Sequence, residues 1–463
     1  YKIMKMKKEI KKLIWLINDE KNLPIKEKEF KAIVRKKKFP NNFIFKFDDD
    51  FFICLHLINS RTLLEFNHNL TWVGVKLFNY CVSGDYEIVN PEVIDKPENI
   101  YLGWCLGNYE FLRFKSKSKE KKEVKLLNVK DEQISEALAI SLVRDLINIP
   151  ANKLGPSELQ KEARKLFSKS ATKITEINGN DLMKKFPLIY NVGKGAEKNK
   201  APIFSEFIWD SKRKKSRKTI VLIGKGVCFD TGGLNLKLGS GMNLMKKDMG
   251  GAANCIGLAK MLVQKKIDIN LKLLLPLVEN SLSSKAIRPS DIIKSRKGLY
   301  IEIGDTDAEG RLILADALTY ACESKPDLII DMATLTGASR VALGTDVPSF
   351  FSNNDFIAEK LIKFSKICGD PLWRLPLWQN YLVQLKSNHA DLNNIGNSFG
   401  GAITAALFLE KFVEKNIPWI HIDLMAWSLN KNLTSYIGGE AMGIRSLLRL
   451  IEYFSKTNLK MQH

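Results

Sequence analysis

The sequence of 463 residues contains little histidine and no cysteine arrangement of the kind that structural metal modules use. It has five histidines and no H-E-x-x-H motif, and its seven cysteines are scattered without a C-x-x-C pair. Scattered cysteines, odd in number, favour free thiols in a reducing compartment and argue against a structural zinc module. A metal site in this chain would therefore use mostly oxygen ligands.

Long hydrophobic runs are also absent from the sequence. No apolar run approaches the 18 residues that a membrane-spanning helix needs. The apolar segment LIWLI, residues 13–17, has only five residues, and acidic residues follow it at once. Such a segment is too short for the apolar centre of a signal peptide. We therefore expect no targeting segment, no membrane partner and a cytoplasmic protein.

The chain carries an excess of positive charge, with a formal net charge of +21. Three segments, residues 1–40, 113–130 and 211–218, together hold a basic excess equal to that whole value. A basic surface of this kind can bind nucleic acid. Aromatic residues are sparse in these segments, which favours a solvated Lys-rich surface instead. Both interpretations stay open at this point.

Composition divides the chain into three parts. Residues 1–112 alternate short apolar runs with charged ones, as in FIFKF and FFICLHLI, which is typical of a small α/β domain. Residues 113–130 are rich in Lys and Ser at their start and predict a basic linker. The remaining residues, 131–463, predict a larger second domain.

From residue 219 onward, β-rich apolar segments alternate with helical segments. Strands are predicted at TIVLIGKGV, INLKLLLPLV, LYIEI, DLIIDMATL and WIHIDL. Helices are predicted at GGAANCIGLAKMLVQKK, AEGRLILADALTYACES and GGAITAALFLEKFVEK. This alternation predicts an α/β fold whose mostly parallel central sheet has helices on both faces.

Polar residues gather in the loops that follow the predicted strands. Lys225, Asp230 and Lys237 follow TIVLIG, and Asp248 lies just before a helix. The carboxyl ends of parallel strands open at one edge of a sheet, where α/β proteins bind ligands. Each residue alone has an ordinary structural explanation. Asp248 could cap the N-terminus of the helix that follows it, and Lys225 could be a solvent-exposed lysine. Together they predict a functional site at that edge.

The stretch GDTDAEGRL places three carboxylates, Asp305, Asp307 and Glu309, at alternate positions, and Arg311 continues the spacing. In an extended chain these side chains share one face and repel unless water, protons or cations intervene. A solvated loop is the simple explanation, and a metal site is the sharper one. Oxygen ligands suit Mg²⁺ or Mn²⁺, and Zn²⁺ also accepts carboxylates. Two such ions can polarise a carbonyl and activate a water molecule.

The motifs GKGVCFDTGG, DMGGAA, DTDAEGRL and ATLTGA resemble those of the leucyl aminopeptidase family, the M17 metallopeptidases. DLINIPANKLGPSEL, GGAITAALFLEKF and WIHIDL are also similar to segments of that family. The resemblance covers residues 131–455 clearly and implies that residues 131–463 form a metallopeptidase catalytic domain. It further implies an aminopeptidase that uses two metal ions and a metal-activated water to remove Leu-like residues from peptide N-termini.

The resemblance also implies which residues hold the metals. The family's five metal-ligand positions are occupied by Lys225, Asp230, Asp248, Asp307 and Glu309. Asp230 and Glu309 would bridge two ions, Mn²⁺ or Zn²⁺, and Asp307 would belong to the more exchangeable site.

Further positions match the catalytic and substrate-binding residues of the family. Lys237 would stabilise the tetrahedral intermediate, and Arg311 would hold a bicarbonate that acts as general base. The positions that line the substrate pocket are occupied by Met245, Thr334, Leu335 and Gly337.

The chain departs from the family pattern at Asp305, where the family has Asn. An ionised Asp305 close to the metals would strengthen cation binding at the exchangeable site. Alternatively, it makes the turn hydrogen bonds that Asn would make. Family members are hexamers, so a homohexamer acting on short peptides is expected.

Two other functions stay open beside the peptidase. The basic segments allow nucleic-acid binding, alone or in addition to peptidase activity. A catalytically silent assembly protein is the third hypothesis, and the presence of Lys237 and Arg311 argues against it.

Overall fold

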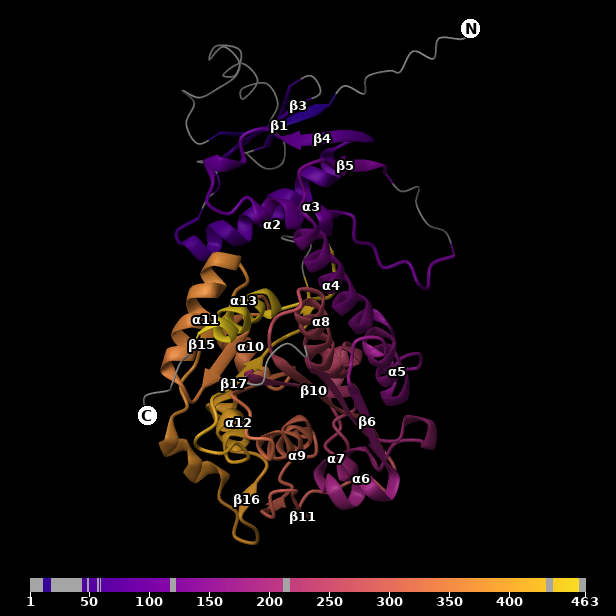
Figure 1. The fold of residues 1–463 in the computed structure, drawn as a ribbon. Helices are drawn as coiled ribbons and strands as arrows, with labels where there is room; N and C mark the ends of the chain where they lie inside the picture. Colours follow the sequence, from indigo (N-terminus) through magenta and orange to yellow (C-terminus); the bar gives the residue numbers. More distant parts are fainter. Residues whose placement is uncertain are drawn as a thin grey trace. The chain divides into compact units, whose positions relative to one another are not determined.

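The computed structural model describes residues 11–17, 44–47, 50–55, 58, 60–116, 122–210, 217–429 and 436–457 (Figure 1). The chain forms two compact units. The first comprises Tyr1–Leu138, Lys366–Gly369 and Asn430–Tyr436, and the second comprises Ala139–Ser365, Asp370–Leu429 and Ile437–His463. The predicted domain boundaries at residues 112 and 130 remain predictions. Most of the basic segments 1–40 and 211–218, and residues 117–121 of the predicted linker, lie outside the described residues.

The first unit is built on a five-stranded sheet with the strand order β2-β3-β1-β4-β5. Its neighbouring strands are parallel except for the β2–β3 pair. Helix α2 begins after Thr62, whose side chain forms a capping box with Glu65. Strand β5 lies within the predicted linker 113–130. The elements are β1 (Lys12–Ile17), β2 (Ile44–Phe47), β3 (Asp50–Cys54), β4 (Gly84–Ile88), β5 (Val124–Leu126), α2 (Leu63–Tyr80) and α3 (Glu98–Gly107).

The second unit is built on a nine-stranded sheet in which the path β15-β14-β17-β13-β8-β10-β7-β6 is hydrogen-bonded and β9 also pairs with β10. The centre, β17-β13-β8-β10, is parallel. The outer pairs β10–β7, β7–β6 and β14–β17 are antiparallel. The strands are β6 (Lys173–Asn178), β7 (Ile203–Asp210), β8 (Thr219–Gly224), β9 (Gly226–Asp230), β10 (Asn270–Asn280), β13 (Leu328–Ala333), β14 (Ser349–Ser352), β15 (Trp373–Arg374) and β17 (Trp419–Asp423).

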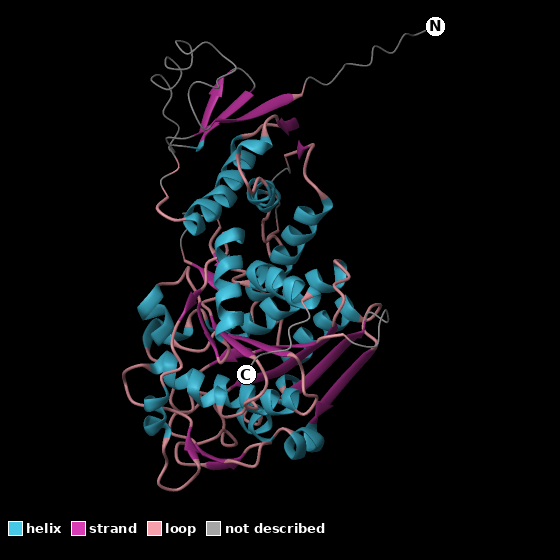
Figure 2. Ribbon diagram, turned by 60° about the vertical axis from the view of Figure 1, so that its left-hand side comes forward, coloured by secondary structure: helices cyan, strands magenta, loops and turns pink. Residues whose placement is uncertain are grey.

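Helices lie on both sides of this sheet, as Figure 2 shows, which confirms the predicted fold class. On one side, Val221 and Ile223 of β8 pack in a buried cluster with residues of α7, α9 and α12. On the other side, Ile220 and Leu222 are equally buried. The helices wholly within this unit are α5 (Pro156–Phe167), α6 (Gly179–Lys185), α7 (Pro187–Gly193), α8 (Gly250–Gln264), α9 (Gly310–Cys322), α10 (Gly337–Leu343), α12 (Gly401–Glu410) and α13 (Ile444–Lys456). Helices α4 (Asp131–Asn148) and α11 (Asp355–Cys368) have residues in both units.

The small residues at the start of α8 allow this helix to approach the sheet closely. A Cβ atom added to Gly251 would lie 2.0 Å from the carbonyl oxygen of Met332, on strand β13. Only glycine fits there, and the close approach holds the residues that precede α8 against the edge of the sheet.

One predicted strand has a different place from the one expected. The segment LYIEI forms β12 (Tyr300–Glu302), which pairs with β11 (Ile292–Lys294) and β16 (Leu392–Asn393) in a separate three-stranded sheet. Because β12 is not a strand of the central sheet, the stretch GDTDAEGRL reaches the site from outside that sheet. A further pair, β18 (Trp427–Ser428) and β19 (Gly438–Gly439), is antiparallel.

Within the described ranges, no helix is long and apolar enough to cross a membrane.

Candidate metal centre

Three carboxylates meet at one point of the second unit. Asp230 ends β9, and Asp307 and Glu309 lie in the turn that leads into α9. One oxygen atom from each carboxylate lies within 4.8 Å of the other two. The structure therefore brings these distant segments together, although one of them does not follow a strand of the central sheet.

Lys225 brings a fourth carboxylate into this cluster. Its Nζ lies 2.8 Å from Oδ2 of Asp248 and 2.9 Å from Oε1 of Glu309, and it donates a hydrogen bond of 3.0 Å to the carbonyl oxygen of Thr334. All these side chains are buried. Gly310 makes room for the lysine, because a Cβ atom there would lie 2.6 Å from its Cε.

Lys237 approaches the cluster from the loop that follows β9. Its Nζ lies 2.8 Å from Oδ2 of Asp230 and also contacts Asp307. The loop that carries the lysine turns at Gly232 and Gly233, which have φ angles of 87° and 65°. Glycine adopts these angles without strain, so the GG pair directs Lys237 back to the carboxylates.

Arg311, in the first turn of α9, lies beside the cluster and is itself buried. Its Nη1 donates a 2.7 Å hydrogen bond to the carbonyl oxygen of Asn394, and its Nε has no hydrogen-bond partner among the described residues. Burial lowers the pKa of Arg311 to about 10, although Glu309 acts in the opposite direction. The guanidinium remains a cation with donor capacity to spare.

Burial and mutual repulsion shift the pKa values of the carboxyl groups. Burial first, and then the charge of Asp230, raises the pKa of Glu309 to about 8 and that of Asp307 to about 6. Burial alone would lower the pKa of Lys225, but Asp248 and Glu309 outweigh it and raise this pKa above its ordinary value. The two lysines thus balance a group of carboxylates that would otherwise repel one another.

The donor set fits divalent cations. Glu309 Oε2 is buried and has no hydrogen-bond or ion-pair partner within the described part of the chain. A buried carboxylate oxygen without a partner is costly, so a ligand of positive charge is expected beside it. Carboxylate oxygens suit hard divalent cations such as Mg²⁺ and Mn²⁺, and Zn²⁺ also accepts them.

The cluster opens into a cavity of about 430 Å³. Two cations of the wall, Lys247 and Arg340, were not singled out by the sequence, although Lys247 lies next to Asp248. Among the lining residues are Lys225, Asp230, Lys237, Asp248, Asp307 and Arg311, together with the residues expected to line a substrate pocket, Met245, Thr334, Leu335 and Gly337. Every predicted site residue therefore lies at this cavity or, for Glu309, in contact with one of its lining residues.

Two asparagines that sequence reasoning missed hold the segments of the site together. Asn280, at the end of β10, donates 2.8 Å and 3.1 Å hydrogen bonds to Oδ1 of Asp230 and to the carbonyl oxygen of Thr306. Asn394 bonds the backbone of Gly304 and Asp305. A lone Asn carries no motif signal, so its position in space alone identifies it.

Asp305 makes a hydrogen bond within the turn, which is one of the two roles predicted for it. Its Oδ1 accepts a 2.8 Å hydrogen bond from the backbone N–H of Asp307. An Asn side chain has an oxygen that can accept the same bond. Asp305 also borders the cavity, so its charge faces the site as well.

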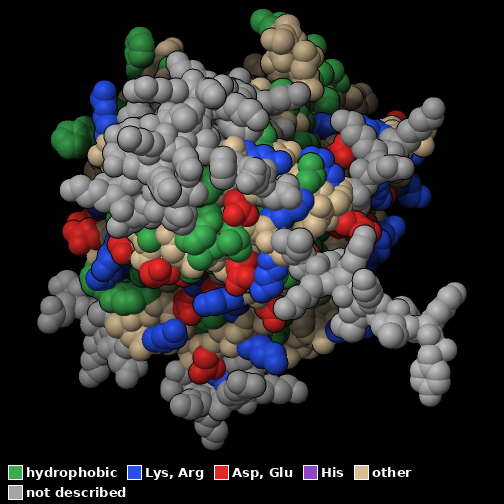
Figure 3. All heavy atoms as spheres, turned by 90° about the horizontal axis from the view of Figure 1, so that it is seen from above, with side chains coloured by type: hydrophobic (Ala, Val, Ile, Leu, Met, Phe, Trp, Pro, Cys, Tyr) green, Lys and Arg blue, Asp and Glu red, His purple; other side chains and the backbone are tan. Residues whose placement is uncertain are grey.

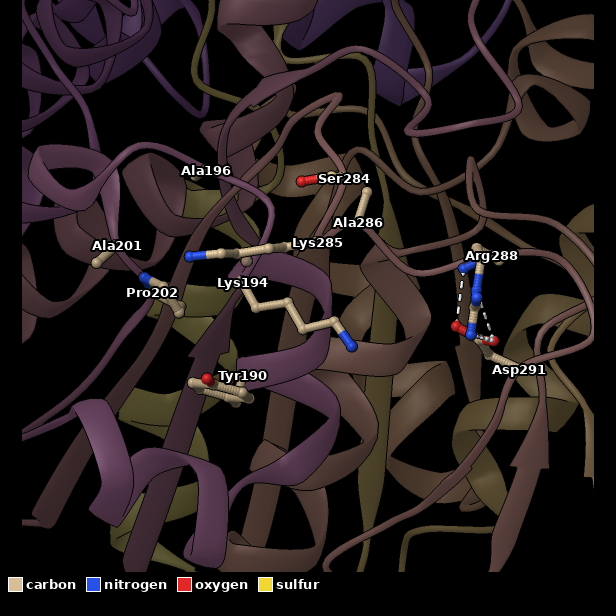
Figure 4. Close-up of a pocket in the computed structure, with 11 residues that line it drawn as sticks. Tyr190, Lys194, Ala196, Ala201, Pro202, Ser284, Lys285, Ala286, Arg288 and Asp291 are labelled. Atoms are coloured by element: carbon tan, nitrogen blue, oxygen red, sulfur yellow. Dashed lines mark hydrogen bonds and ion pairs between the residues drawn. The ribbon is translucent and has the colours of Figure 1, made fainter.

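A second cavity, of about 560 Å³, lies elsewhere in the second unit and holds none of the predicted site residues (Figure 4). Lys194 and Lys285 extend across it, and the Arg288 side chain is paired with Asp291 at 3.0 Å. Lys194 donates to Oδ1 of Asn191. The mixed polar lining contains no cluster of carboxylates.

Metal-dependent hydrolases need buried oxygen donors that hold divalent cations beside cationic side chains, and this cluster supplies both. The chain belongs to the cytosol aminopeptidase family: residues 141–448 match the model of that family's catalytic domain. It is therefore a metallo-aminopeptidase.

Relatives and solved structures agree with this assignment. A probable cytosol aminopeptidase of Aquifex aeolicus is 41% identical over 361 residues, which are 75% of this chain and 73% of the relative. The crystal structure of a cytosol aminopeptidase from Coxiella burnetii superposes with a TM-score of 0.87 at 36% identity and covers 97% of this chain and 98% of that one. The structure of a bottromycin maturation enzyme in complex with Mn superposes with a TM-score of 0.82 at 25% identity. The match covers 96% of this chain and 99% of that one.

Proposed function

We propose that this metallo-aminopeptidase holds two divalent cations in the carboxylate cluster and uses them to remove N-terminal residues from peptides. The observation that carries the proposal is the meeting of Asp230, Asp307 and Glu309, with one buried oxygen of Glu309 unpartnered. Asp230 and Glu309 would contribute ligands to both ions. Lys225 and Asp248 would complete one site, and Asp307 the other.

The residues around the ions have distinct tasks in this proposal. When bound, divalent cations polarise the scissile carbonyl and activate a water molecule. Lys237 would donate to the carbonyl oxygen as negative charge develops there. Its present carboxylate partners, Asp230 and Asp307, would be balanced by bound cations and would no longer need the lysine. Arg311 uses its unpartnered Nε and the rest of its guanidinium to hold an anion such as bicarbonate that accepts a proton.

The substrates we propose are peptides with a free amine and an apolar, Leu-like first residue. Met245, Leu335 and Gly337 give the cavity wall an apolar part that suits such a side chain. Mn²⁺ and Zn²⁺ are the proposed ions, a homohexamer is the proposed assembly, and the cytoplasm is the proposed location, as the family name of the relatives suggests.

Nucleic-acid binding remains a prediction from composition alone. The basic segments lie mostly outside the described residues. On the face that Figure 3 shows, Lys and Arg side chains of the described residues are interspersed with Asp and Glu side chains. No observation favours this second function, so we do not propose it.

The proposed function is tested by hydrolysis of Leu-p-nitroanilide before and after metal removal. We expect a chelator to abolish hydrolysis and Mn²⁺ to restore it. The matched substrate N-acetyl-Leu-p-nitroanilide, which lacks a free amine, should remain uncleaved. Hydrolysis that persists after complete metal removal, or equal cleavage of the acetylated substrate, would refute the proposal.

A further inference from the structure

Two cations in the wall of the active-site cavity have no task in the proposed chemistry. Lys247 belongs to the short 3₁₀ segment Met245–Met249, and Arg340 belongs to helix α10. Both side chains line the cavity that contains the carboxylate cluster. Neither is assigned to metal binding or to the reacting carbonyl, so their presence in this wall needs another explanation.

Lys247 is the more unusual of the two. Its side chain is only 2% exposed, which places it among the largest fully buried side chains of the chain. Within the described part of the molecule, its ammonium group forms neither a hydrogen bond nor an ion pair. A buried ammonium without a partner is unfavourable, so a ligand that brings an anion into the cavity would stabilise it.

Among the described residues, the nearby acids Asp248 and Asp423 act on Lys247 electrostatically but form no ion pair with it, and their oxygens already have other partners. Oδ1 of Asp248 accepts a 2.6 Å hydrogen bond from Thr334, and Oδ2 is paired with Lys225 at 2.8 Å. Both oxygens of Asp423 accept hydrogen bonds from the segment that leads into α10, namely from Leu335 N and from the backbone N–H and hydroxyl of Thr336.

Arg340 places a second positive charge on the same cavity. It lies one turn along α10 from Gly337, and its Nη2 would be 3.7 Å from a Cβ atom added to that glycine. No acidic side chain of the described residues lies within ion-pair distance of it. The absence of a side chain at Gly337 leaves this guanidinium accessible from the part of the cavity that is predicted to hold the substrate.

The cations of the second cavity differ from Lys247 in their exposure and their partners. There, Lys285 is exposed to solvent, Lys194 has Asn191 as a partner, and Arg288 has Asp291 (Figure 4). Solvent and partners satisfy those charges, so they indicate no ligand. Burial combined with the lack of a partner distinguishes Lys247 from them.

We propose that Lys247 and Arg340 bind a carboxylate group of the peptide substrate, an inference that rests on the proposed peptidase function. Arginine and lysine together are well suited to a carboxylate, because charge-assisted hydrogen bonds are the stronger class. The carboxylate has two sources, the side chain of an N-terminal Glu or Asp and the C-terminal carboxylate of a short peptide. The enzyme therefore accepts an acidic group in addition to apolar first residues.

The experiment compares pairs of substrates that differ in one charge. Glu-p-nitroanilide against Gln-p-nitroanilide tests the side-chain source, and Leu-Leu against Leu-Leu-amide tests the C-terminal source. Each pair is measured as a ratio of kcat/KM with Mn²⁺ for the wild type, Lys247→Met and Arg340→Gln. Lys285→Met, which changes an exposed lysine of the second cavity, is the matched control.

We expect one of the two pairs to favour the charged substrate in the wild type. Each cavity variant should lower that ratio about 10- to 100-fold, mainly through KM, because one charge-assisted hydrogen bond is lost. Lys285→Met should leave the ratio unchanged. Arg340 is half-buried at a helix surface, so Arg340→Gln keeps the test valid even where Lys247→Met does not fold.

Two different failures are distinguishable. Ratios in both pairs that are unaffected by Arg340→Gln would overturn the carboxylate assignment while leaving the peptidase intact. A wild type that hydrolyses none of the four substrates, nor Leu-p-nitroanilide, in the presence of Mn²⁺ would overturn the proposed function, and the inference with it.

Discussion

Replacement of Asn280 by Ala tests whether the metal centre is positioned by the residue that links its two halves. The Asn280 side chain donates to Oδ1 of Asp230 and to the carbonyl oxygen of Thr306, and all three residues are buried. The backbone oxygen of Asn280 accepts from Thr231 in either case, so the substitution removes only the two side-chain bonds.

The size of the effect follows from which hydrogen bonds are lost. Asp230 Oδ1 keeps a 2.9 Å hydrogen bond from Gly232 N, whereas the carbonyl oxygen of Thr306 is left without the amide. One buried acceptor without its partner costs about 1–3 kcal/mol of unfolding free energy. Without these bonds, the segment that carries Asp307 is no longer tied to Asp230. Mn²⁺ affinity should therefore fall about 10- to 100-fold, as for other residues that orient metal ligands.

The assay is Mn²⁺ titration by calorimetry, together with thermal unfolding of the metal-free protein. Asn191→Ala is the control, because Asn191 also donates a side-chain hydrogen bond to a backbone carbonyl, that of Pro187, but lies outside the site. It should lower stability without changing Mn²⁺ affinity. An Asn280→Ala protein that binds Mn²⁺ as tightly as the wild type would refute the reasoning.

Three further predictions concern the site itself. Lys237→Ala and Arg311→Ala should retain bound metal and lose turnover about 10²- to 10³-fold, the usual cost of one preorganised electrostatic contact, as measured by kcat and metal analysis. Glu309→Ala should lose both ions, whereas Asp307→Ala should lose mainly the exchangeable one, as counted by metal analysis after dialysis. Asp305→Asn should leave the Mn²⁺ activation curve unshifted, because Asn can accept the same backbone hydrogen bond.

Each of these predictions has a result that contradicts it. Near-native kcat in Lys237→Ala or Arg311→Ala would remove that residue from the catalytic assignment. Two ions per chain in Glu309→Ala would be incompatible with a bridging carboxylate. If Asp305→Asn required more Mn²⁺ for activation, the charge of Asp305, rather than its turn contact, would be its contribution.

Sequence reasoning anticipated the parts of the fold that depend on local patterns. The alternation of apolar and helical segments after residue 219 predicted the parallel centre of the sheet, and the motifs predicted the residues that surround the cavity. The parallel centre was predictable because a buried parallel strand is a short run of apolar residues whatever its partner. The cavity residues could be singled out because glycines and carboxylates at strand ends are visible in the sequence.

The remaining features depend on contacts between distant segments. The run LYIEI looks like any other buried strand, and only its pairing with β11 and β16 excludes it from the central sheet. Strand β6, KITEIN, lies at the edge of the sheet and is largely exposed, so it lacks an apolar signal. The burial of Lys247 could not be predicted from the sequence either. A lysine in a basic stretch is ordinarily solvated, and no neighbouring residue indicates that this one is buried.

The central claim is that the cluster around Asp230, Asp307 and Glu309 holds two divalent cations on which hydrolysis depends. Equilibrium dialysis of the metal-free protein against Mn²⁺, with Leu-p-nitroanilide hydrolysis followed at each concentration, tests it most directly. The account predicts saturation at two ions per chain and full activity only at that occupancy. Saturation at one ion or none, or full activity in the metal-free protein, would contradict it.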